Sequence, residues 1–343
     1  MPSRLRVAVV GLGWVGTHRH LPWLRRETAV EVVGVIDHKP QRVQAVALRA
    51  GERSAVAEDH SGVPWLEAVD AVSIATPPAV HHRLALGYLE AGKHVLLEKP
   101  MAMDVAQAAE LQAAAERAGR TLALVHNFQF ARSVLQLRRL LAAGRLGHLR
   151  GIWAVQLSNP RRRLPKWYES LPLGLFYDES PHFMYLLRAL LPAEPELRSA
   201  CVVASKEGRV TPARVTALFE AGGVPAQVDM AFEAPVSEWH LAVLGSERLA
   251  VVDIFRDILV VVRNDRGHGA GDILATSFDG VRGHLWGTLT SGLRLAAGRL
   301  AYGNDEVVRR FAAACREGTA PAGITAEDGR RVVAMQHAIL DRA

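Results

Sequence analysis

Two places in the sequence bring together side chains that can move a proton. A strand-like apolar run ends in Glu98-Lys99-Pro100, so a lysine stands directly after it. Further along, Asp178 and His182 are four residues apart, which puts a carboxylate and an imidazole on one face if a helix begins there. A lysine of lowered pKa or a neutral histidine can take a proton from a hydroxyl group. These residues therefore indicate general acid–base chemistry.

A glycine-rich turn near the start of the chain predicts a dinucleotide site. The apolar run Leu5–Val10 leads into the pattern GxGxxG, after which a helix is expected. The first glycine permits a tight turn, the second lets a pyrophosphate approach the backbone, and the third lets helix and strand pack closely. Free N–H groups at the helix start favour phosphate. The turn residues of this predicted site are Gly11, Gly13, Trp14, Val15 and Gly16. The alternative is a purely structural turn.

The residue that ends the second expected strand bears on the choice of cofactor. Asp37 lies about 20 residues beyond the turn, where an acidic side chain can accept hydrogen bonds from the adenosine ribose. Its charge would repel a 2′-phosphate, so NAD is favoured. His38 and Lys39 follow directly and could accommodate a phosphate, which leaves NADP open.

Composition limits the classes of protein to consider. The 343 residues carry a formal charge of +6, with 49% hydrophobic residues, as expected of a folded protein of two domains with anionic partners. Basic residues cluster tightly only at Arg161–Arg163, which argues against nucleic acid. No apolar run approaches the length of a membrane span, and Cys201 and Cys315 indicate neither disulfide nor zinc, so a reducing cytoplasm is expected.

The order of strands and helices expected around these residues differs between the two parts of the chain. The first part alternates strands with helices, which predicts a parallel, doubly wound sheet. The expected strands are Leu5–Val10, Val30–Ile36, Ala71–Ala75, Val95–Leu97 and Thr121–Val125. The expected helices are Val15–Arg26, Gln41–Ala50, Val80–Ala91 and Val105–Ala118.

After about residue 145 the strands follow one another with few helices, which predicts a mainly antiparallel sheet. The expected strands are Ile152–Leu157, Ala200–Ser205, Thr216–Phe219, Ala226–Phe232, His240–Leu244 and Leu259–Val262. Helices are expected at Pro181–Leu191 and at Ala326–Leu340, the second capped by Thr325 with Asp328. The glycine-rich stretch Gly267–Gly287 is expected to be a long loop.

Taken together, the motifs resemble the Gfo/Idh/MocA family of sugar and polyol oxidoreductases. The matching segments run in the family's order: the glycine turn, Ala75–Pro78 with His81-His82, Glu98–Pro100, His126–Phe128, Gly144–Gly147, Asp178 with His182, and Gly323–Gly329. The resemblance implies an α/β protein with a Rossmann domain at 1–125 and a substrate-binding and oligomerisation α+β domain with a large open sheet at 126–325. It also implies a C-terminal helix, 326–343, that packs back towards the first domain.

The resemblance also assigns roles to residues. Lys99 would hydrogen-bond the reacting oxygen and contact the cofactor, His182 would share or perform the proton transfer, and Asp178 would orient it or bind substrate; substrate would lie between Lys99 and His182. The further cofactor contacts it implies are Thr76, Pro77, His81 and Glu98. The implied substrate contacts are Asn127, Gln129, Arg163, Trp167 and Tyr177. Ser180 and Gln129 depart from the family pattern, which leaves the substrate open.

Other features allow more than one interpretation. The basic and aromatic segment around Arg161–Arg163 and Trp167 either binds a phosphate on a sugar or is a solvated loop. His18, His20, His81 and His82 match no metal-ligand spacing, so a surface role and no metal are expected. The expected reaction moves a hydride between a nicotinamide and a secondary hydroxyl or ketone of a sugar, polyol or nucleotide-linked sugar. The alternatives are glycoside cleavage through transient oxidation and a non-catalytic dinucleotide sensor. A homo-oligomer, dimer or tetramer, is expected to form through the C-terminal sheet.

Overall fold

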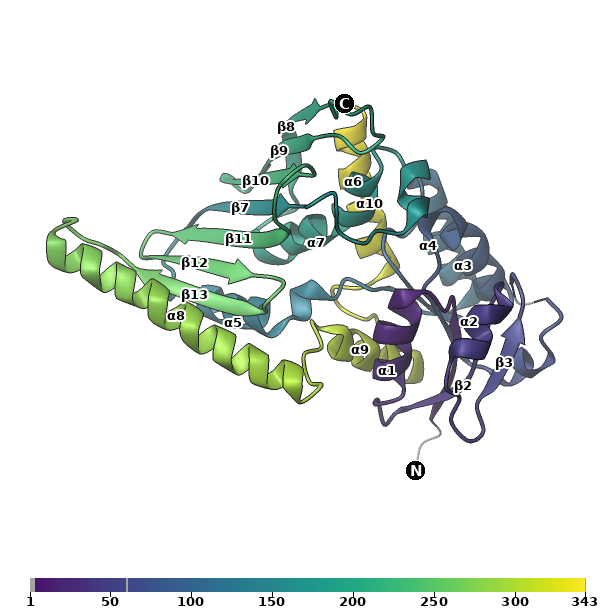
Figure 1. The fold of residues 1–343 in the computed structure, drawn as a ribbon. Helices are drawn as coiled ribbons and strands as arrows, with labels where there is room; N and C mark the ends of the chain where they lie inside the picture. Colours follow the sequence, from purple (N-terminus) through teal and green to yellow (C-terminus); the bar gives the residue numbers. More distant parts are fainter. Residues whose placement is uncertain (1–3, 60, 343) are drawn as a thin grey trace. The chain divides into compact units, whose positions relative to one another are not determined.

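The computed structural model describes residues 4–59 and 61–342. The chain divides into two compact units, 1–127 with 304–337, and 128–303 with 338–343 (Figure 1). The segment 304–325 thus belongs with the first unit, whereas the predicted second domain ran to residue 325. Within the described ranges, none of the helices combines the length and hydrophobicity that crossing a bilayer requires.

The first unit is built on a six-stranded parallel sheet in the order β3-β2-β1-β4-β5-β6. The strands are β1 Leu5–Val10, β2 Val30–Asp37, β3 Arg53–Val56, β4 Ala71–Ile74, β5 His94–Leu97 and β6 Leu122–Leu124. The side chains of β4 are all buried, because helices cover both faces of such a sheet. The predicted parallel, doubly wound sheet is confirmed. Edge strand β3 was missed, since its largely exposed residues carry no apolar run.

The helices of this unit follow the predicted alternation, two with the predicted bounds and the others shorter, and one at 304–317 was not predicted. They are η1 Gly16–His20, α1 Leu21–Leu24, α2 Pro40–Ala45, α3 His81–Glu90, α4 Val105–Ala118, α9 Asn304–Glu317 and α10 Ala326–Leu340, with short turns Pro64–Ala68 and Pro78–Val80. Helix α10 ends in the segment assigned to the other unit. One continuous α-helix over Val15–Arg26 was wrong, because η1 is a π-turn in which Leu21 N–H donates to Gly16 O. Pro22 has no N–H to continue the regular ladder.

The cap of α10 follows the predicted reciprocal pattern. Asp328 N–H donates to Thr325 Oγ1 at 3.1 Å, and Thr325 N–H donates to Asp328 Oδ2 at 2.9 Å. The strand-like segment before this helix also meets the sheet, since Leu124 N–H donates to Ile324 O at 2.8 Å. The start of α10 is thereby fixed beside β6.

The second unit holds a seven-stranded sheet in the order β13-β12-β11-β7-β10-β9-β8. The strands are β7 Leu149–Leu157, β8 Glu196–Val203, β9 Arg214–Ala221, β10 Val224–Ala231, β11 Glu238–Gly245, β12 Arg248–Asp253 and β13 Ile258–Arg263. Every pair is antiparallel except β7 with β10, so the predicted mainly antiparallel sheet is confirmed. Along β10 and β11 buried and half-exposed residues alternate, as in a sheet covered on one face.

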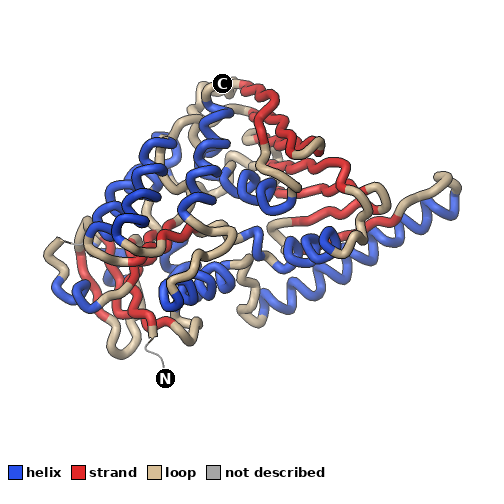
Figure 2. Tube along the Cα trace, turned by 180° about the vertical axis from the view of Figure 1, so that it is seen from behind, coloured by secondary structure: helices blue, strands red, loops and turns tan. Residues whose placement is uncertain are grey.

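The helices of the second unit include one where the sequence predicted a loop. They are α5 Arg132–Ala142, α6 Leu175–Glu179, α7 Pro181–Leu190 and α8 Ala270–Ala296, with short turns Phe128–Phe130 and Lys166–Ser170. The expected loop over Gly267–Gly287 was wrong, because most of it belongs to the 27-residue helix α8. Gly283 and Gly287 face β13, where an added Cβ would come within 3.1 Å of Val260 and 2.4 Å of Ile258. These glycines serve close helix–strand packing. Figure 2 shows α8 running beside this edge of the sheet.

Candidate active site

The carboxyl ends of neighbouring parallel strands bring the candidate cofactor residues of the first unit to one edge. Val10 of β1 is in register with Ile36 of β2 and Ile74 of β4, and Ile74 with Leu97 of β5. Gly11, Asp37, Thr76 and Lys99 follow these strand ends within two residues. Ligands of open α/β sheets bind at this edge.

The three glycines of the turn have the geometry that a dinucleotide requires. Gly11 has φ +92°, and an added Cβ there would lie 2.7 Å from Ala75 O. A Cβ on Gly16 would lie 1.9 Å from Gly11 O, so only glycine allows this helix start to pack on the turn. A Cβ on Gly13 would meet nothing within 4 Å. Gly13 therefore presents bare backbone towards open space, as an approaching pyrophosphate needs. Trp14 and Val15, beside it, are exposed.

Asp37 fixes this turn as well as facing the cofactor edge. Its carboxylate is buried and accepts the N–H of Leu12 at 2.7 Å and that of Lys39 at 2.8 Å. The Arg42 guanidinium lies 3.3 Å from Oδ2, and the His38 ring 3.3 Å from Oδ1. The acidic residue predicted from spacing is thus hydrogen-bonded to the glycine turn, with the Arg42 guanidinium and the His38 ring beside it.

A buried polar network supports Lys99. Glu98 Oε1 lies 2.9 Å from His20 Nε2, and His20 Nδ1 lies 2.7 Å from Ser73 Oγ. Glu98 Oε2 accepts the backbone N–H of Lys99 at 3.0 Å. Burial would raise the pKa of Glu98, but the His20 hydrogen bond and the charges of His20 and Lys99 lower it overall. The carboxylate is therefore ionised at neutral pH.

The peptide bond between Lys99 and Pro100 is cis. His81 links this segment to Thr76. Its Nδ1 lies 2.7 Å from Pro100 O, and its Nε2 lies 2.8 Å from Thr76 O. The hydroxyl of Thr76 is buried and has no hydrogen-bond partner among the described residues, so it is available to a bound group.

The expectation of surface histidines was wrong for two of the four. His20 and His81 are buried, and burial lowers the pKa of His81. His18 is exposed and stacks on Trp14 with ring centroids 5.3 Å apart. The described residues contain no group of side chains suited to a metal ion. Sequence spacing missed the His20 network, because its members come from three separate segments.

His182, in the second unit, is packed among aromatic side chains. It stands in the first turn of α7, and its Nδ1 is 2.7 Å from the hydroxyl of Tyr185. That hydroxyl also accepts the N–H of Phe128 at 3.1 Å. The rings of Phe128 and Trp239 lie 4.8 Å and 5.3 Å from the His182 ring, centroid to centroid. The ring is therefore held on several sides. Tyr185 was missed, although its spacing of three from His182 on one helix could have indicated it.

Asp178 is half-buried on α6, and Ser180 between α6 and α7 has helical φ and ψ. Asp178 and His182 therefore keep their four-residue spacing along a nearly continuous helical stretch, which puts them on the same side of it. The next residue, Glu179, is buried and pairs with Arg162 and with the amide of Gln156. One arginine of the basic cluster thus stabilises a buried carboxylate.

The expected substrate contacts differ in exposure. Arg163 is exposed and Trp167 half-buried. Tyr177, Asn127 and Gln129 are buried, and Tyr177 has no exposed surface at all. A substrate contact for each of these residues stays a prediction.

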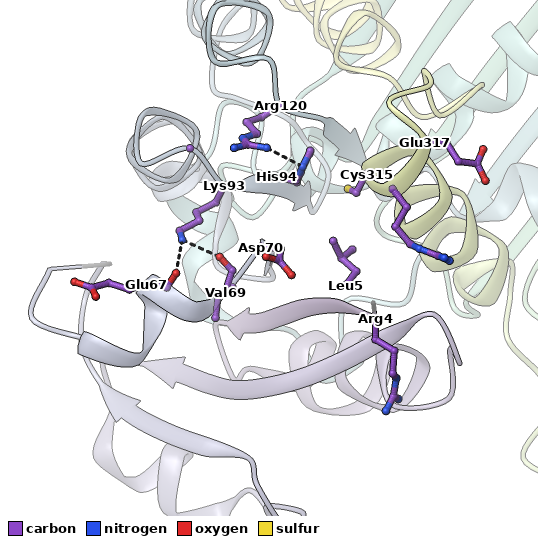
Figure 3. A pocket seen from close by; sticks show the side chains of 12 residues that line it. Arg4, Leu5, Glu67, Val69, Asp70, Lys93, His94, Arg120, Cys315 and Glu317 are labelled. Atoms are coloured by element: carbon purple, nitrogen blue, oxygen red, sulfur yellow. Dashed lines mark hydrogen bonds between the residues drawn. The ribbon is translucent and has the colours of Figure 1, made fainter. Parts of the chain in front are cut away.

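A cavity of 540 Å³ in the first unit lies away from the cofactor edge (Figure 3). It is lined at the amino ends of the strands, by Leu5 at the start of β1, Asp70 before β4 and His94 at the start of β5. Lys93 there donates to Val69 O at 2.8 Å. In a parallel sheet the amino ends lie opposite the carboxyl ends, so this cavity is not the dinucleotide site.

Comparisons with known proteins agree with this arrangement. A family model described as "Oxidoreductase family, NAD-binding Rossmann fold" matches residues 5–126. A second model, described as "GFO/IDH/MocA C-terminal domain", matches residues 134–251. The chain belongs to the Gfo/Idh/MocA oxidoreductase family, and its first unit is an NAD-binding Rossmann domain.

Among curated relatives, D-glucoside 3-dehydrogenase of Escherichia coli (strain K12) is 35% identical over 147 residues, which are 43% of this chain and 42% of that protein. The 1,5-anhydro-D-fructose reductase of Ensifer adhaerens is 33% identical over 233 residues, 65% of this chain and 68% of that one. The chain spans about half the length of the first curated relatives it matches.

Solved structures share the whole fold. A 3-ketoreductase from Actinomadura kijaniata, in complex with NADP and TDP-benzene, superposes with a TM-score of 0.77 at 22% identity, covering 98% of this chain and 97% of that one. A UDP-N-acetylglucosamine 3-dehydrogenase from Acidithiobacillus ferrooxidans gives a TM-score of 0.74 at 22% identity, covering 99% and 98%. These similarities extend the fold assignment over both units.

Proposed function

We propose that this chain is a nicotinamide-dependent dehydrogenase or reductase that acts on a secondary hydroxyl or ketone of a sugar or nucleotide-linked sugar. The observation that carries the proposal is the shared strand edge, where the open backbone of Gly13, the buried hydroxyl of Thr76 and Lys99 follow adjacent strands. The nicotinamide, when bound, supplies the hydride acceptor or donor. The chain must then hold the cofactor and move one proton.

The proposed cofactor is NAD, held by the glycine turn and by Asp37. The turn offers N–H groups at a helix start to the phosphates. Because the Asp37 carboxyl group is buried beside the turn, a 2′-phosphate would meet an acidic side chain there. Arg42 and His38 lie close enough to Asp37 to offset part of this repulsion, so use of NADP as a second cofactor is expected.

Lys99 is proposed to move the proton, and His182 to hold the reacting oxygen. Tyr185 positions the ring of His182, because its hydroxyl accepts the N–H of Phe128 at 3.1 Å and lies 2.7 Å from Nδ1. In the proposed tautomer Nδ1 accepts the Tyr185 proton, so the ring carries its own proton on Nε2 and donates a hydrogen bond from it to the reacting oxygen. Lys99, whose backbone is fixed by ionised Glu98, is the group that alternates between ammonium and amine.

The proposed position of reaction is carbon 3 of a hexose-derived substrate. Three of the similar proteins carry names that specify this position: a D-glucoside 3-dehydrogenase, a UDP-N-acetylglucosamine 3-dehydrogenase and a 3-ketoreductase. The exposed Arg163 is proposed to meet a phosphate of the substrate, with Trp167 four positions further along the chain. A reducing cytoplasm and a homo-oligomer complete the proposal.

The test is turnover of NAD or NADH with a panel of glucosides, UDP-sugars and TDP-sugars and their 3-keto forms, for the full chain and for Lys99→Ala. The variant is expected to lose about 10²–10⁴-fold in kcat, because it lacks the proton-transfer group, with NAD affinity within about twofold. Survival of activity in Lys99→Ala would refute this role. Tight NAD binding without turnover on any substrate would favour a sensor.

A further inference from the structure

Helix α8 presents a long apolar stripe on its exposed side. Large apolar residues recur three or four positions apart, so they share one face of the helix. They are Leu274, Phe278, Val281, Leu285, Leu289 and Leu293, each 54% to 71% exposed. Trp286, 69% exposed, widens this stripe in its middle.

The opposite face of α8 is fixed to the second unit. Gly283 and Gly287 let the helix approach β13 closely, and the hydroxyl of Ser291 donates to Arg256 O. Two ion pairs join the helix to neighbouring segments, Arg263 with Asp279 at 2.7 Å and Arg294 with Asp257 at 2.5 Å. The stripe is thus held in place by packing on its far side, and folding of the second unit leaves it uncovered.

The area of the stripe is that of an interface rather than of ordinary surface. At these exposed fractions each side chain leaves on the order of 100 Å² accessible, or roughly 700–900 Å² in all. The largest apolar patch of a typical monomer is about 300–600 Å². Each partner in a standard protein–protein interface contributes about 800 Å². The stripe alone therefore provides the area that one side of a stable dimer needs.

We propose that the stripe is covered by the same stripe of a second copy of this chain, so that two α8 helices pack about a twofold axis. A twofold interface brings a surface against itself, and a mostly apolar stripe is complementary to itself. The ionisable residues exposed along the helix are Arg282 and His284. Arg282 is four residues from both Phe278 and Trp286, so it lies between them, and its long side chain can keep the guanidinium in water at the border of the interface.

The charge pattern argues against a membrane surface as the occupant. Helices that lie on bilayers carry a polar face rich in lysine and arginine. Here the positions that border the stripe include the neutral Ser277 and Thr288, and the opposite face packs on β13. One arginine and one histidine are too few for such a helix.

The test is sedimentation velocity of the full chain over a range of concentrations, with Phe278→Glu/Leu285→Glu as the interface variant. Ser277→Glu is the control, because it adds one such charge one position from Phe278 but outside the stripe. Trp153→Glu, on the open face of the sheet, tests the other expected interface. Far-UV circular dichroism and the melting temperature establish that each variant is folded.

The expected result is a self-associating chain whose dimer dissociation constant rises by about a hundredfold or more in the double variant and stays within about threefold in Ser277→Glu. A monomeric parent chain would overturn the proposal, as would an unchanged dimer in the folded double variant. Dissociation by Trp153→Glu with no effect of the double variant would assign assembly to the sheet alone. A monomeric parent that sediments with anionic phospholipid vesicles would show that the stripe serves a membrane.

Discussion

Alanine substitutions at two glycines of the same turn should have different effects, one on the stability of the first unit and the other on NAD affinity. In Gly16→Ala the new Cβ would lie 1.9 Å from Gly11 O, about 1.5 Å short of the 3.4 Å at which ordinary contact begins. The obstructing atom is a backbone carbonyl in a turn that Asp37 also holds, so it cannot rotate away. Overpacking of this kind costs about 2–3 kcal/mol, which lowers the melting temperature of a unit this size by about 5–10 °C.

Gly13→Ala should have the opposite pattern. Its Cβ meets nothing within 4 Å, so the free energy of unfolding should change by less than about 0.5 kcal/mol. The methyl group would stand where the pyrophosphate approaches the backbone, and NAD affinity should fall by at least about tenfold.

The assays are thermal unfolding without cofactor and NAD titration by calorimetry, on the parent chain and both variants. Gly280→Ala on α8, whose Cβ also meets nothing within 4 Å, is the control that should leave NAD affinity unchanged and should not lower the melting temperature, since alanine favours a helix interior. An unchanged melting temperature in Gly16→Ala would refute the packing argument. Parental NAD affinity in Gly13→Ala would refute the placement of the pyrophosphate.

Three further predictions concern single side chains. Asp37→Asn keeps an acceptor for Leu12 N–H but removes the charge, so the ratio of kcat/KM for NADP to that for NAD should rise at least about tenfold; an unchanged ratio would show that Asp37 does not select the cofactor. Tyr185→Phe removes the hydroxyl that bonds His182 Nδ1, so kcat should fall by about tenfold with a shifted pH–rate profile, whereas a purely structural role would leave the profile unmoved. Because burial lowers the pKa of His81, the unfolded chain binds more protons than the folded one below about pH 6.5. The free energy of unfolding should therefore rise with pH through that window and be fully gained above it, and urea unfolding of His81→Gln should show a flatter dependence.

The sequence by itself determined the elements whose signals are local. The strand β1 and the helices α4 and α10 have the bounds that apolar runs and stop signals predicted, and the Thr325–Asp328 cap forms as expected. The glycine turn could be predicted because each glycine is required by local geometry. At Gly11 and Gly16 a Cβ would clash with nearby backbone atoms. Such features depend on residues a few positions apart.

Tertiary structure decided whatever depends on residues far apart in the chain. The glycines of α8 indicate a loop until β13 is placed beside them, where their lack of a side chain allows close packing. The burial of His20 follows from Ser73 and Glu98, which two other strands bring to it. The ring of His182 meets Trp239 from β11, a neighbour that no spacing could indicate. The chemistry was visible as residue types, but the hydrogen bonds that orient it exist only where the folded sheets bring distant segments together.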